Sequence, residues 1–369
     1  MKVRLSKCSI GHEETNAVSN VLSSEYLGMG SVVRDFELAI KDYLATEMEV
    51  VCVNTATSAL QLALSALDIG VNDEVLVPSI TYVGGFQAIS ATGATPIPCE
   101  IDPDTLFIDI ADAAKKITSK TKAIMPVHYA SASNGMDEIY ELAKNNNLRV
   151  IEDAAQAFGS KRNNKMIGTE GDIVCFSFDG IKNITSGEGG AILTNDKNVH
   201  QRLSDDRLLG VKKDSDKRYA GKRSWDFDVE NQGYRFHMSN INAAIGIEQL
   251  KKLDEFRIKR QQVAKYYIEH LSKIRAIKIL TLNYDEIVPH IFVARAADRN
   301  NLRDFLIKNE IECGIHYKPN HLLTKYKTDI KLPITEEVYE QLITFPCHVD
   351  LKRIELNHVI NKIKEFYNG

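Results

Sequence analysis

Between residues 50 and 196 the sequence alternates short apolar runs, rich in β-branched residues, with segments of helical spacing. The apolar runs are EVVCVN, DEVLVPS, ATPIPCE, TKAIMPV, NLRVIED, GDIVCFSF and GGAILTND, separated by segments such as SALQLALSAL and MDEIYELAKNNN. Runs that are apolar on both faces are typical of strands buried between two layers of helices. The alternation therefore predicts an α/β fold built on a parallel or mixed sheet.

Helical patterns flank this core on both sides. In VVRDFELAIKDYL the apolar residues have helical spacing, so a helix leads into the first strand. A long helical pattern runs from Ser239 to about Leu271, followed by HIFVARA, the helix RNNLRDFLIKNE and a final helix from about Arg353. We therefore expect a large domain at 1–250 and a smaller α+β C-terminal domain at 251–369.

Composition and charge argue against several classes of partner. The chain has 369 residues, 44% hydrophobic and 26% charged, and a formal net charge of -4, which is typical of a soluble globular protein. Nucleic acid is not expected as a partner, nor is a membrane, because no apolar run approaches membrane-spanning length. The N-terminal MKVRLSKCSIGHEE lacks the apolar centre of a secretory signal, so we expect a cytoplasmic protein.

The cysteines give no sign of a metal site. All six lie far apart, and most stand in apolar surroundings such as VVCVN and DIVCFSF. The sequence contains no CxxC, HExxH or paired Cys and His spacing, so we expect small core residues and no metal.

Ligands of open α/β sheets bind at the carboxyl ends of the strands, so residues that follow strands are candidates for a site. In VCVNTATSALQLAL, Thr57 and Ser58 stand where a helix begins, and a helix N-terminus with two hydroxyls suits an anion. In LRVIEDAAQAFG, Asp153 ends a buried strand, where a carboxylate needs a cationic or hydrogen-bonding partner. Taken alone, each feature is explained as well or better by a helix cap.

Together with Lys182, these features are better explained by a ligand site than by helix caps. Lys182 stands in FSFDGIKNITSGEGGAILTND, between a strand-like run and a cluster of glycines. An isolated lysine is in most cases a solvated surface residue. Pyridoxal phosphate (PLP), however, requires a lysine nucleophile, an Asp against its ring nitrogen and a cradle for its phosphate. The chain offers all three at strand ends, so PLP is the predicted cofactor.

At these motifs the sequence resembles the DegT/StrS-type aminotransferases, a branch of the fold-type I PLP enzymes. The resemblance covers nearly the whole chain, and its most specific segments are VIEDAAQAFGS and FSFDGIKNITSGEGG, with GYRFHMSNINAAIGIEQL and GIHYKPNH further on. It implies a large domain with a mixed, mostly parallel sheet, a smaller C-terminal domain, and a homodimer with shared active sites.

The resemblance implies a role for each residue of the predicted cofactor site. Lys182 would be the Schiff-base lysine and would move a proton between cofactor and substrate carbons. Asp153 would keep the ring nitrogen protonated, and Gln156 would contact the ring hydroxyl. The remaining residues would hold the phosphate or, in the case of Tyr82, stack on the ring: Thr57, Ser58, Ser177 and Tyr82. Without the resemblance, Tyr82 is equally explained as a half-buried residue at a strand end.

Several positions depart from the family pattern. Ala56 replaces a frequent glycine, and Asp179 and Gly180 replace a proline-containing turn. In GYRFHMSN, Arg235 replaces a phosphate-binding asparagine and His237 replaces an arginine. In the family this segment reaches the neighbouring subunit's cofactor, so the resemblance implies that Arg235 would do the same. An arginine binds phosphate at least as well as an asparagine.

The resemblance also implies a substrate site. The residues assigned to it are Leu27, Gly28, His128, Tyr129, Tyr317 and His321, beside His316. A satisfied structural histidine is the alternative for His321. The basic run from Lys212 to Arg223 would cover a sugar diphosphate from the partner subunit, or would be a solvated loop.

The resemblance implies a PLP-dependent aminotransferase that passes an amino group from glutamate to a nucleotide-linked keto-deoxysugar. The leading candidate is the TDP-linked 4-keto-6-deoxyglucose, giving a 4-amino-4,6-dideoxy sugar for a surface polysaccharide such as lipopolysaccharide O-antigen. The alternatives are 3-keto sugars and UDP or GDP carriers. A dehydratase on this scaffold would carry histidine in place of Lys182. A regulatory paralogue would not need the lysine, and a nicotinamide dehydrogenase would need GxGxxG, which GEGGAI does not match.

Overall fold

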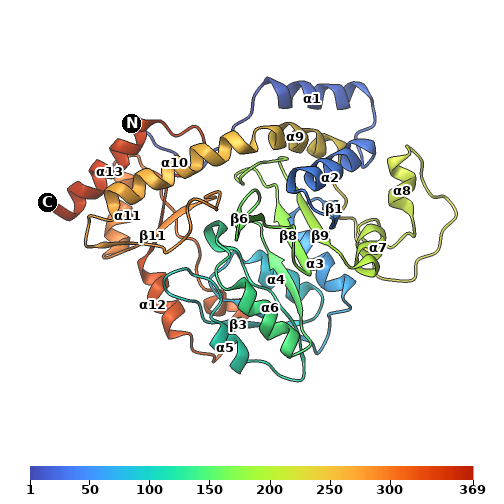
Figure 1. The fold of residues 1–369 in the computed structure, drawn as a ribbon, viewed down its shortest axis with the longest axis horizontal. Coiled ribbons are helices and arrows are strands. Elements are labelled where there is room, and N and C mark those ends of the chain that lie inside the picture. The colour runs from blue at the N-terminus through green and yellow to red at the C-terminus, as the bar shows by residue number, and fades with distance from the viewer. Residues whose placement is uncertain (369) are drawn as a thin grey trace.

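Seven strands form one central sheet in the computed structural model, which describes residues 1–368 (Figure 1). The strand order is β1-β9-β8-β5-β4-β2-β3. The strands are β1 (Glu49–Val53), β2 (Glu74–Pro78), β3 (Thr95–Cys99), β4 (Thr121–Ile124), β5 (Arg149–Asp153), β8 (Ile173–Ser177) and β9 (Gly190–Thr194). Only β9 runs antiparallel to its neighbours, β1 and β8. The predicted mixed, mostly parallel sheet is confirmed.

Both faces of the sheet are buried because alternate residues of each strand enter different cores. In β1, Val51 and Val53 pack on the face covered by α3 (Ala56–Ala66), α4 (Gly84–Ala91) and α7 (Lys197–Asp206). Val50 and Cys52 pack on the opposite face. That face is covered by α2 (Ser31–Leu44), α5 (Ile110–Lys115), α6 (Met136–Asn145) and α9 (Asn240–Lys251). This arrangement explains why the strand sequences are apolar throughout rather than alternating.

A second, antiparallel sheet lies in the C-terminal part of the chain. Its strands are β10 (Ile277–Ile279), β11 (Phe292–Ala296) and β12 (Leu342–Phe345), and its helices are α10 (Leu253–Leu271), α11 (Arg299–Lys308), α12 (Pro333–Gln341) and α13 (Arg353–Asn368). Val3 is buried in the same core and bridges to Ile311, so the N-terminal segment packs here too (Figure 1).

The remaining elements are short or peripheral. They are α1 (His12–Ser23), β6 (Lys161–Arg162), β7 (Lys165–Met166), α8 (Asp214–Tyr219) and three 3-10 turns at Tyr129–Ser131, Asn320–Leu322 and Thr324–Tyr326. Within residues 1–368, none of the helices has the length and apolar character needed to cross a bilayer. The same residues contain no group of three His, Cys, Asp or Glu side chains placed to hold a metal ion.

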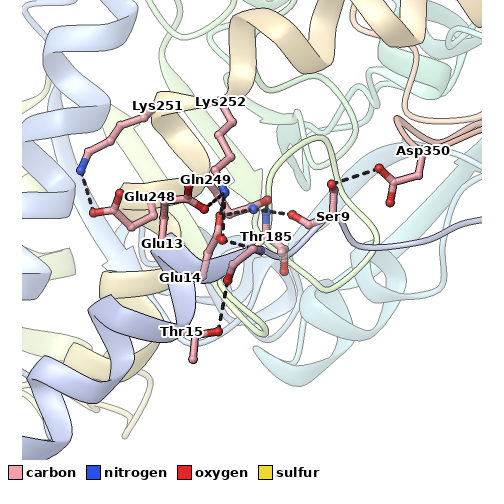
Figure 2. Close-up of polar contacts among 11 residues, drawn as sticks. Ser9, Glu13, Glu14, Thr15, Thr185, Glu248, Gln249, Lys251, Lys252 and Asp350 are labelled. Atoms are coloured by element: carbon pink, nitrogen blue, oxygen red, sulfur yellow. Dashed lines mark hydrogen bonds and ion pairs between the residues drawn. The ribbon is translucent and has the colours of Figure 1, made fainter.

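The helical pattern from Ser239 to Leu271 forms two helices rather than one, because the chain breaks at Lys252 between α9 and α10. A buried carboxylate sits against this junction (Figure 2). Glu14, on α1, accepts hydrogen bonds from Lys252 Nζ and Gln249 Nε2, each at 2.7 Å, and from the Gly11 amide at 2.8 Å. Burial raises the pKa of Glu14, but these donors outweigh it and bring the pKa to about 2.

Gln249 extends the contact to two further segments. Its Nε2 donates to the carbonyl of Ser9 at 2.8 Å, and its Oε1 accepts from the Thr185 amide at 3.4 Å. Thr185 belongs to the loop that follows Lys182. The Glu14 cluster therefore joins the N-terminal segment, the break between α9 and α10, and the lysine loop (Figure 2).

The buried charge of Glu14 should make stability depend on pH. Glu14→Gln keeps the shape of the side chain but removes the charge, and at pH 7 we expect it to lower the free energy of unfolding by about 2 kcal/mol. Because folding lowers the pKa of Glu14 from 4.5, its contribution is complete above that pH and is lost as the pH falls toward 2. Urea unfolding of both proteins from pH 7 to pH 2 should show the difference shrinking.

The matched control is Glu13→Gln. Glu13 contacts the same Lys252 Nζ at 3.1 Å but its side chain is 60% exposed. We expect it to cost much less than Glu14→Gln, because solvent screens an exposed ion pair. A Glu14→Gln difference that stays constant down to pH 2 would contradict this account.

Candidate active site

A cavity of about 450 Å³ opens at the carboxyl ends of the strands. Seven of the predicted residues line it: Thr57, Tyr82, Asp153, Gln156, Ser177, Lys182 and Tyr317. They come from segments up to 260 positions apart in the chain, and the parallel strands bring them to one edge of the sheet.

One end of the cavity is formed by the N-terminus of α3. Thr55 caps the helix, since its Oγ1 accepts the Ser58 amide at 3.0 Å, and its hydroxyl also bonds the Ser58 hydroxyl at 2.8 Å. Ser58 is thereby directed to the cap, whereas Thr57 lines the cavity. The first amides of a helix have no partner within it, so this end attracts an anion.

Gly190 allows this turn to lie close to the sheet. A Cβ at Gly190 would come within 2.6 Å of the Thr55 carbonyl oxygen, which a real side chain cannot do. Ser177, which pairs with Gly190 across β8 and β9, lines the cavity nearby.

Asp153 is a buried carboxylate with one of its two oxygens free of hydrogen bonds from the described residues. Its Oδ1 accepts the Ala155 amide at 3.1 Å, and its Oδ2 accepts no hydrogen bond from residues 1–368. Burial raises the pKa of Asp153, and the Ala155 amide and the nearby Lys182 offset this only in part. Such a carboxylate fits a cationic group in the cavity.

Gln156 is held by two contacts on either side of its amide. Its Oε1 accepts the Ala130 amide at 2.8 Å, and its Nε2 lies 3.4 Å from the hydroxyl of Tyr317. The ring of Tyr317 lies 5.8 Å from that of Tyr82, which is 59% exposed. Tyr82 is thus more open than a half-buried strand-end tyrosine would be.

Lys182 lies on the loop between β8 and β9, with its amine in the cavity. Burial lowers the pKa of Lys182, although the carboxylates of Asp153 and Asp179 act in the opposite direction. No carboxylate of residues 1–368 comes within ion-pair distance of the amine. An amine with a lowered pKa and no ion pair suits a nucleophile.

The residues present fit PLP. The unpaired Asp153 oxygen can accept a hydrogen bond from a protonated ring nitrogen, the N-terminus of α3 can hold a phosphate, and Lys182 can react with an aldehyde.

Five of the six predicted substrate residues lie outside this cavity, all except Tyr317. His128 is 1% exposed, with Nε2 2.6 Å from Glu152 Oε2 and Nδ1 3.0 Å from the Ala132 carbonyl oxygen. The prediction that His128 faces the main cavity is therefore wrong. His321 is also satisfied elsewhere, by the Ser79 hydroxyl at 2.7 Å and by Glu336 at 3.3 Å. This is the structural histidine that the sequence left open.

Tyr129 is buried behind the cavity wall. Its hydroxyl donates to the carbonyl of His316, and its ring packs edge-on against Tyr317. It therefore supports residues that line the cavity instead of lining it, because the 3-10 turn that begins at Tyr129 directs the side chain into the core.

Leu27, Gly28 and Arg235 are exposed and lie away from the cavity of their own chain. The carbonyls of Leu27 and Gly28 both accept the Asn240 amide, which fixes their backbone at the start of α9. A role for these residues requires a partner subunit and stays a prediction.

The sequence did not reveal His290, which lines the cavity beside Lys182. Its Nε2 lies 3.5 Å from Lys182 Nζ, although the two residues are 108 positions apart. Burial, followed by the charges of Lys182 and Arg260, holds the pKa of His290 well below its usual range. His290 is a single histidine before a buried strand, and no motif around it marks it as a site residue.

Comparisons with known proteins match this geometry. The sequence profile of the DegT/DnrJ/EryC1/StrS aminotransferase family matches residues 8–364. The chain belongs to this family. It is similar to GDP-perosamine synthase of Escherichia coli O157:H7, with 36% identity over 98% of this chain and 97% of that protein. It is also similar to dTDP-4-dehydro-2,3,6-trideoxy-D-glucose 4-aminotransferase of Saccharopolyspora spinosa, with 32% identity over 98% and 96%.

A solved structure of similar fold is the putative sugar aminotransferase Spr1654 from Streptococcus pneumoniae in its PLP form. It superposes with a TM-score of 0.92 at 28% identity, covering 100% of this chain and 99% of that one. The predicted family, the fold class, the sugar aminotransferase activity and the PLP cofactor are thereby confirmed.

The charge of Asp153 should govern cofactor affinity. Asp153→Asn keeps the size of the side chain but cannot form a charge-assisted hydrogen bond, so we expect PLP to bind about 10- to 100-fold more weakly. Titration of the cofactor-free protein with PLP, followed by absorbance or protein fluorescence, measures the Kd. Asp179→Asn is the matched control, because Asp179 lines the same cavity but is only partly buried, whereas Asp153 is buried. Equal effects of the two substitutions would contradict the assignment.

Proposed function

We propose that this enzyme transfers an amino group from glutamate to a keto-deoxysugar carried on a nucleotide. The leading candidate is the TDP-linked 4-keto-6-deoxyglucose, whose amination gives a 4-amino-4,6-dideoxy sugar for a surface polysaccharide. The observation that carries the proposal is the pair of Lys182 and Asp153 in one cavity, an amine and a carboxylate without an ion pair between them. Two of the similar proteins bear the names of sugar-nucleotide enzymes, one a GDP-perosamine synthase and one a dTDP-4-dehydro-2,3,6-trideoxy-D-glucose 4-aminotransferase.

PLP, when bound, supplies an electron sink that allows a proton to be removed from a carbon next to the amine nitrogen. Lys182 would hold the cofactor covalently and then carry that proton, which an amine of lowered pKa can do near neutral pH. Asp153 would keep the ring nitrogen protonated through its free Oδ2. The N-terminus of α3, with Thr57 and Ser177, would bind the phosphate.

The aromatic side of the cavity would orient ring and substrate. Tyr82 would cover the ring face, because it is exposed at the cavity mouth. The amide Nε2 of Gln156 lies 3.4 Å from the hydroxyl of Tyr317. Both groups would contact polar groups of the cofactor or the sugar. A dehydratase with histidine in place of the lysine is disfavoured, since Lys182 occupies this position.

We further propose a homodimer in which Arg235 reaches the cavity of the partner subunit. Arg235 is exposed, and the segment before it exposes three large apolar side chains: Trp225 at 85%, Phe227 at 56% and Val229 at 45%. Apolar surface of this kind is typical of an interface. The basic run from Lys212 to Arg223 would then lie near the sugar diphosphate, although Lys212 and Arg218 already pair with Glu230 and Asp214.

A two-step spectroscopic experiment tests the proposed reaction. Adding glutamate to the PLP-loaded protein should convert the cofactor to its amine form, with release of 2-oxoglutarate, and a suitable keto sugar nucleotide should restore the original spectrum. A panel of TDP, UDP and GDP sugars with 3-keto or 4-keto groups identifies the substrate. Lys182→Ala should show neither change, because it lacks the amine. Failure of glutamate and of every sugar to alter the spectrum would contradict the proposal.

Mixing two inactive variants tests the shared site. Lys182→Ala and Arg235→Ala should each be nearly inactive as homodimers. A random mixture should recover about a quarter of wild-type activity, because half of the dimers are mixed and each mixed dimer keeps one intact site. Equilibration at low protein concentration followed by an activity assay measures the recovery. If no activity returns although subunit exchange is demonstrated with a tag, Arg235 acts within its own chain or not at all.

A further inference from the structure

The amine of Lys182 has a single hydrogen-bonding partner among residues 1–368. This partner is Nε2 of His290, at 3.5 Å. The contact is not explained by holding the cofactor ring or its phosphate, because it involves only the reactive nitrogen. What it does to the amine depends on where the hydrogen of the imidazole ring lies.

The surroundings of His290 place this hydrogen on Nε2. The side chain is 3% exposed, and its Nδ1 is buried without a hydrogen-bond partner in the described residues. A buried N–H group without an acceptor is rarer and costlier than a buried acceptor without a donor. The neutral ring with its hydrogen on Nε2 avoids that cost, since only the lone pair of Nδ1 is then left unused.

A buried arginine fixes this arrangement. Arg260, on α10, is 2% exposed, and its Nη1 donates to the carbonyls of Pro289, His290 and Cys347 at 3.1 to 3.2 Å. Its Nη2 lies 3.4 Å from the carbonyl of Lys182. One guanidinium thus joins the backbone of the histidine to that of the lysine, and its positive charge disfavours a second proton on the ring.

We propose that His290 is a positioning residue that holds the free amine of Lys182 in its unprotonated form, by donating its Nε2 hydrogen to the lone pair of Nζ. An ammonium group has no lone pair, so this hydrogen bond exists only with the neutral amine. The form that can attack the cofactor aldehyde is therefore stabilised before the cofactor arrives. The inference uses the proposed function only in that Lys182 is the lysine that binds PLP.

Other groups around the Lys182 amine also affect whether it is charged or neutral. Those that face it from the surrounding elements are Asp153 from β5, Asp179 from its own loop, Glu188 from the segment before β9, Arg260 from α10, and His316 and Tyr317 from the segment before β12. Asp153 and Asp179 favour the ammonium form. His316 is neutral, because burial, the largest cause, lowers its pKa to about 4. The Nε2 hydrogen of His290 favours the neutral amine instead, and it acts from closer to Nζ than either carboxylate does.

The test measures the pKa of the Lys182 amine in the full-length chain freed of cofactor. Competitive acetylation with acetic anhydride across pH 6 to 11, with the Lys182 peptide quantified by mass spectrometry, gives this pKa without any substrate. His290→Leu removes the donor, and we expect the pKa to rise by about one unit, which makes labelling at pH 7 about tenfold slower. His290→Gln, whose amide N–H can replace the donor, should stay close to the wild type.

His316→Leu is the matched control, because His316 is a neutral histidine of the same cavity that does not bond the amine. We expect no change in the Lys182 pKa. An unchanged or lowered pKa in His290→Leu would overturn the proposal, since a lowered value means that the ring accepts a proton from an ammonium. An equal rise in His316→Leu would overturn it too, because general cavity polarity would then explain the shift.

A second measurement uses the wild-type protein alone, so it does not depend on whether a variant folds. The ¹⁵N chemical shifts of labelled histidine in the cofactor-free wild type report which ring nitrogen of His290 carries the hydrogen. Hydrogen on Nε2 supports the proposal, and hydrogen on Nδ1 overturns it. Neither experiment involves glutamate or a sugar, so a failure here is distinct from a failure of the proposed reaction.

Discussion

The site depends on the burial of two opposite charges that do not form an ion pair with each other. Burial lowers the pKa of Lys182 and raises that of Asp153, so each group is held away from the charge state it prefers in water. A direct ion pair would remove both shifts and would leave neither group free for a ligand. The protein must therefore keep the two apart on rigid supports, one on the end of β5 and one on the loop after β8.

These supports are held by the central sheet and by a buried ion pair beside β1. Arg207 is 1% exposed and donates to Glu37 Oε1 at 2.6 Å and to the Cys52 carbonyl at 2.7 Å. Glu37 in turn accepts the Cys52 amide at 2.8 Å, so both backbone groups of Cys52 are bonded to the pair. This fixes the end of β1 immediately before the turn at Thr55, and with it the first amides of α3.

Much of this could be predicted from the sequence, because strands, caps and the lysine loop are set by local patterns. The strands, the helix that begins near Thr57, and the places of Asp153 and Lys182 after strands all follow from short local runs. The break at Lys252 was not predicted, because the pattern from Ser239 to Leu271 has helical spacing throughout, and the contact of Lys252 with Glu14 joins residues distant in sequence. His128 was misplaced and His290 was missed for a similar reason, since their contacts, with Glu152 and Lys182, are made by residues distant in sequence.

Strand geometry explains why Glu152 and Asp153, adjacent in sequence, have different functions. Neighbouring side chains of a strand point to opposite faces of the sheet, so Asp153 enters the cavity while Glu152 points away from it. Glu152 is satisfied by His128 and by the Tyr140 hydroxyl, each at 2.6 Å, whereas Asp153 keeps an oxygen without a partner. Two buried carboxylates with the same local sequence context thus differ in how fully their oxygens are bonded. That difference, more than burial itself, separates a structural carboxylate from one that is available to a ligand.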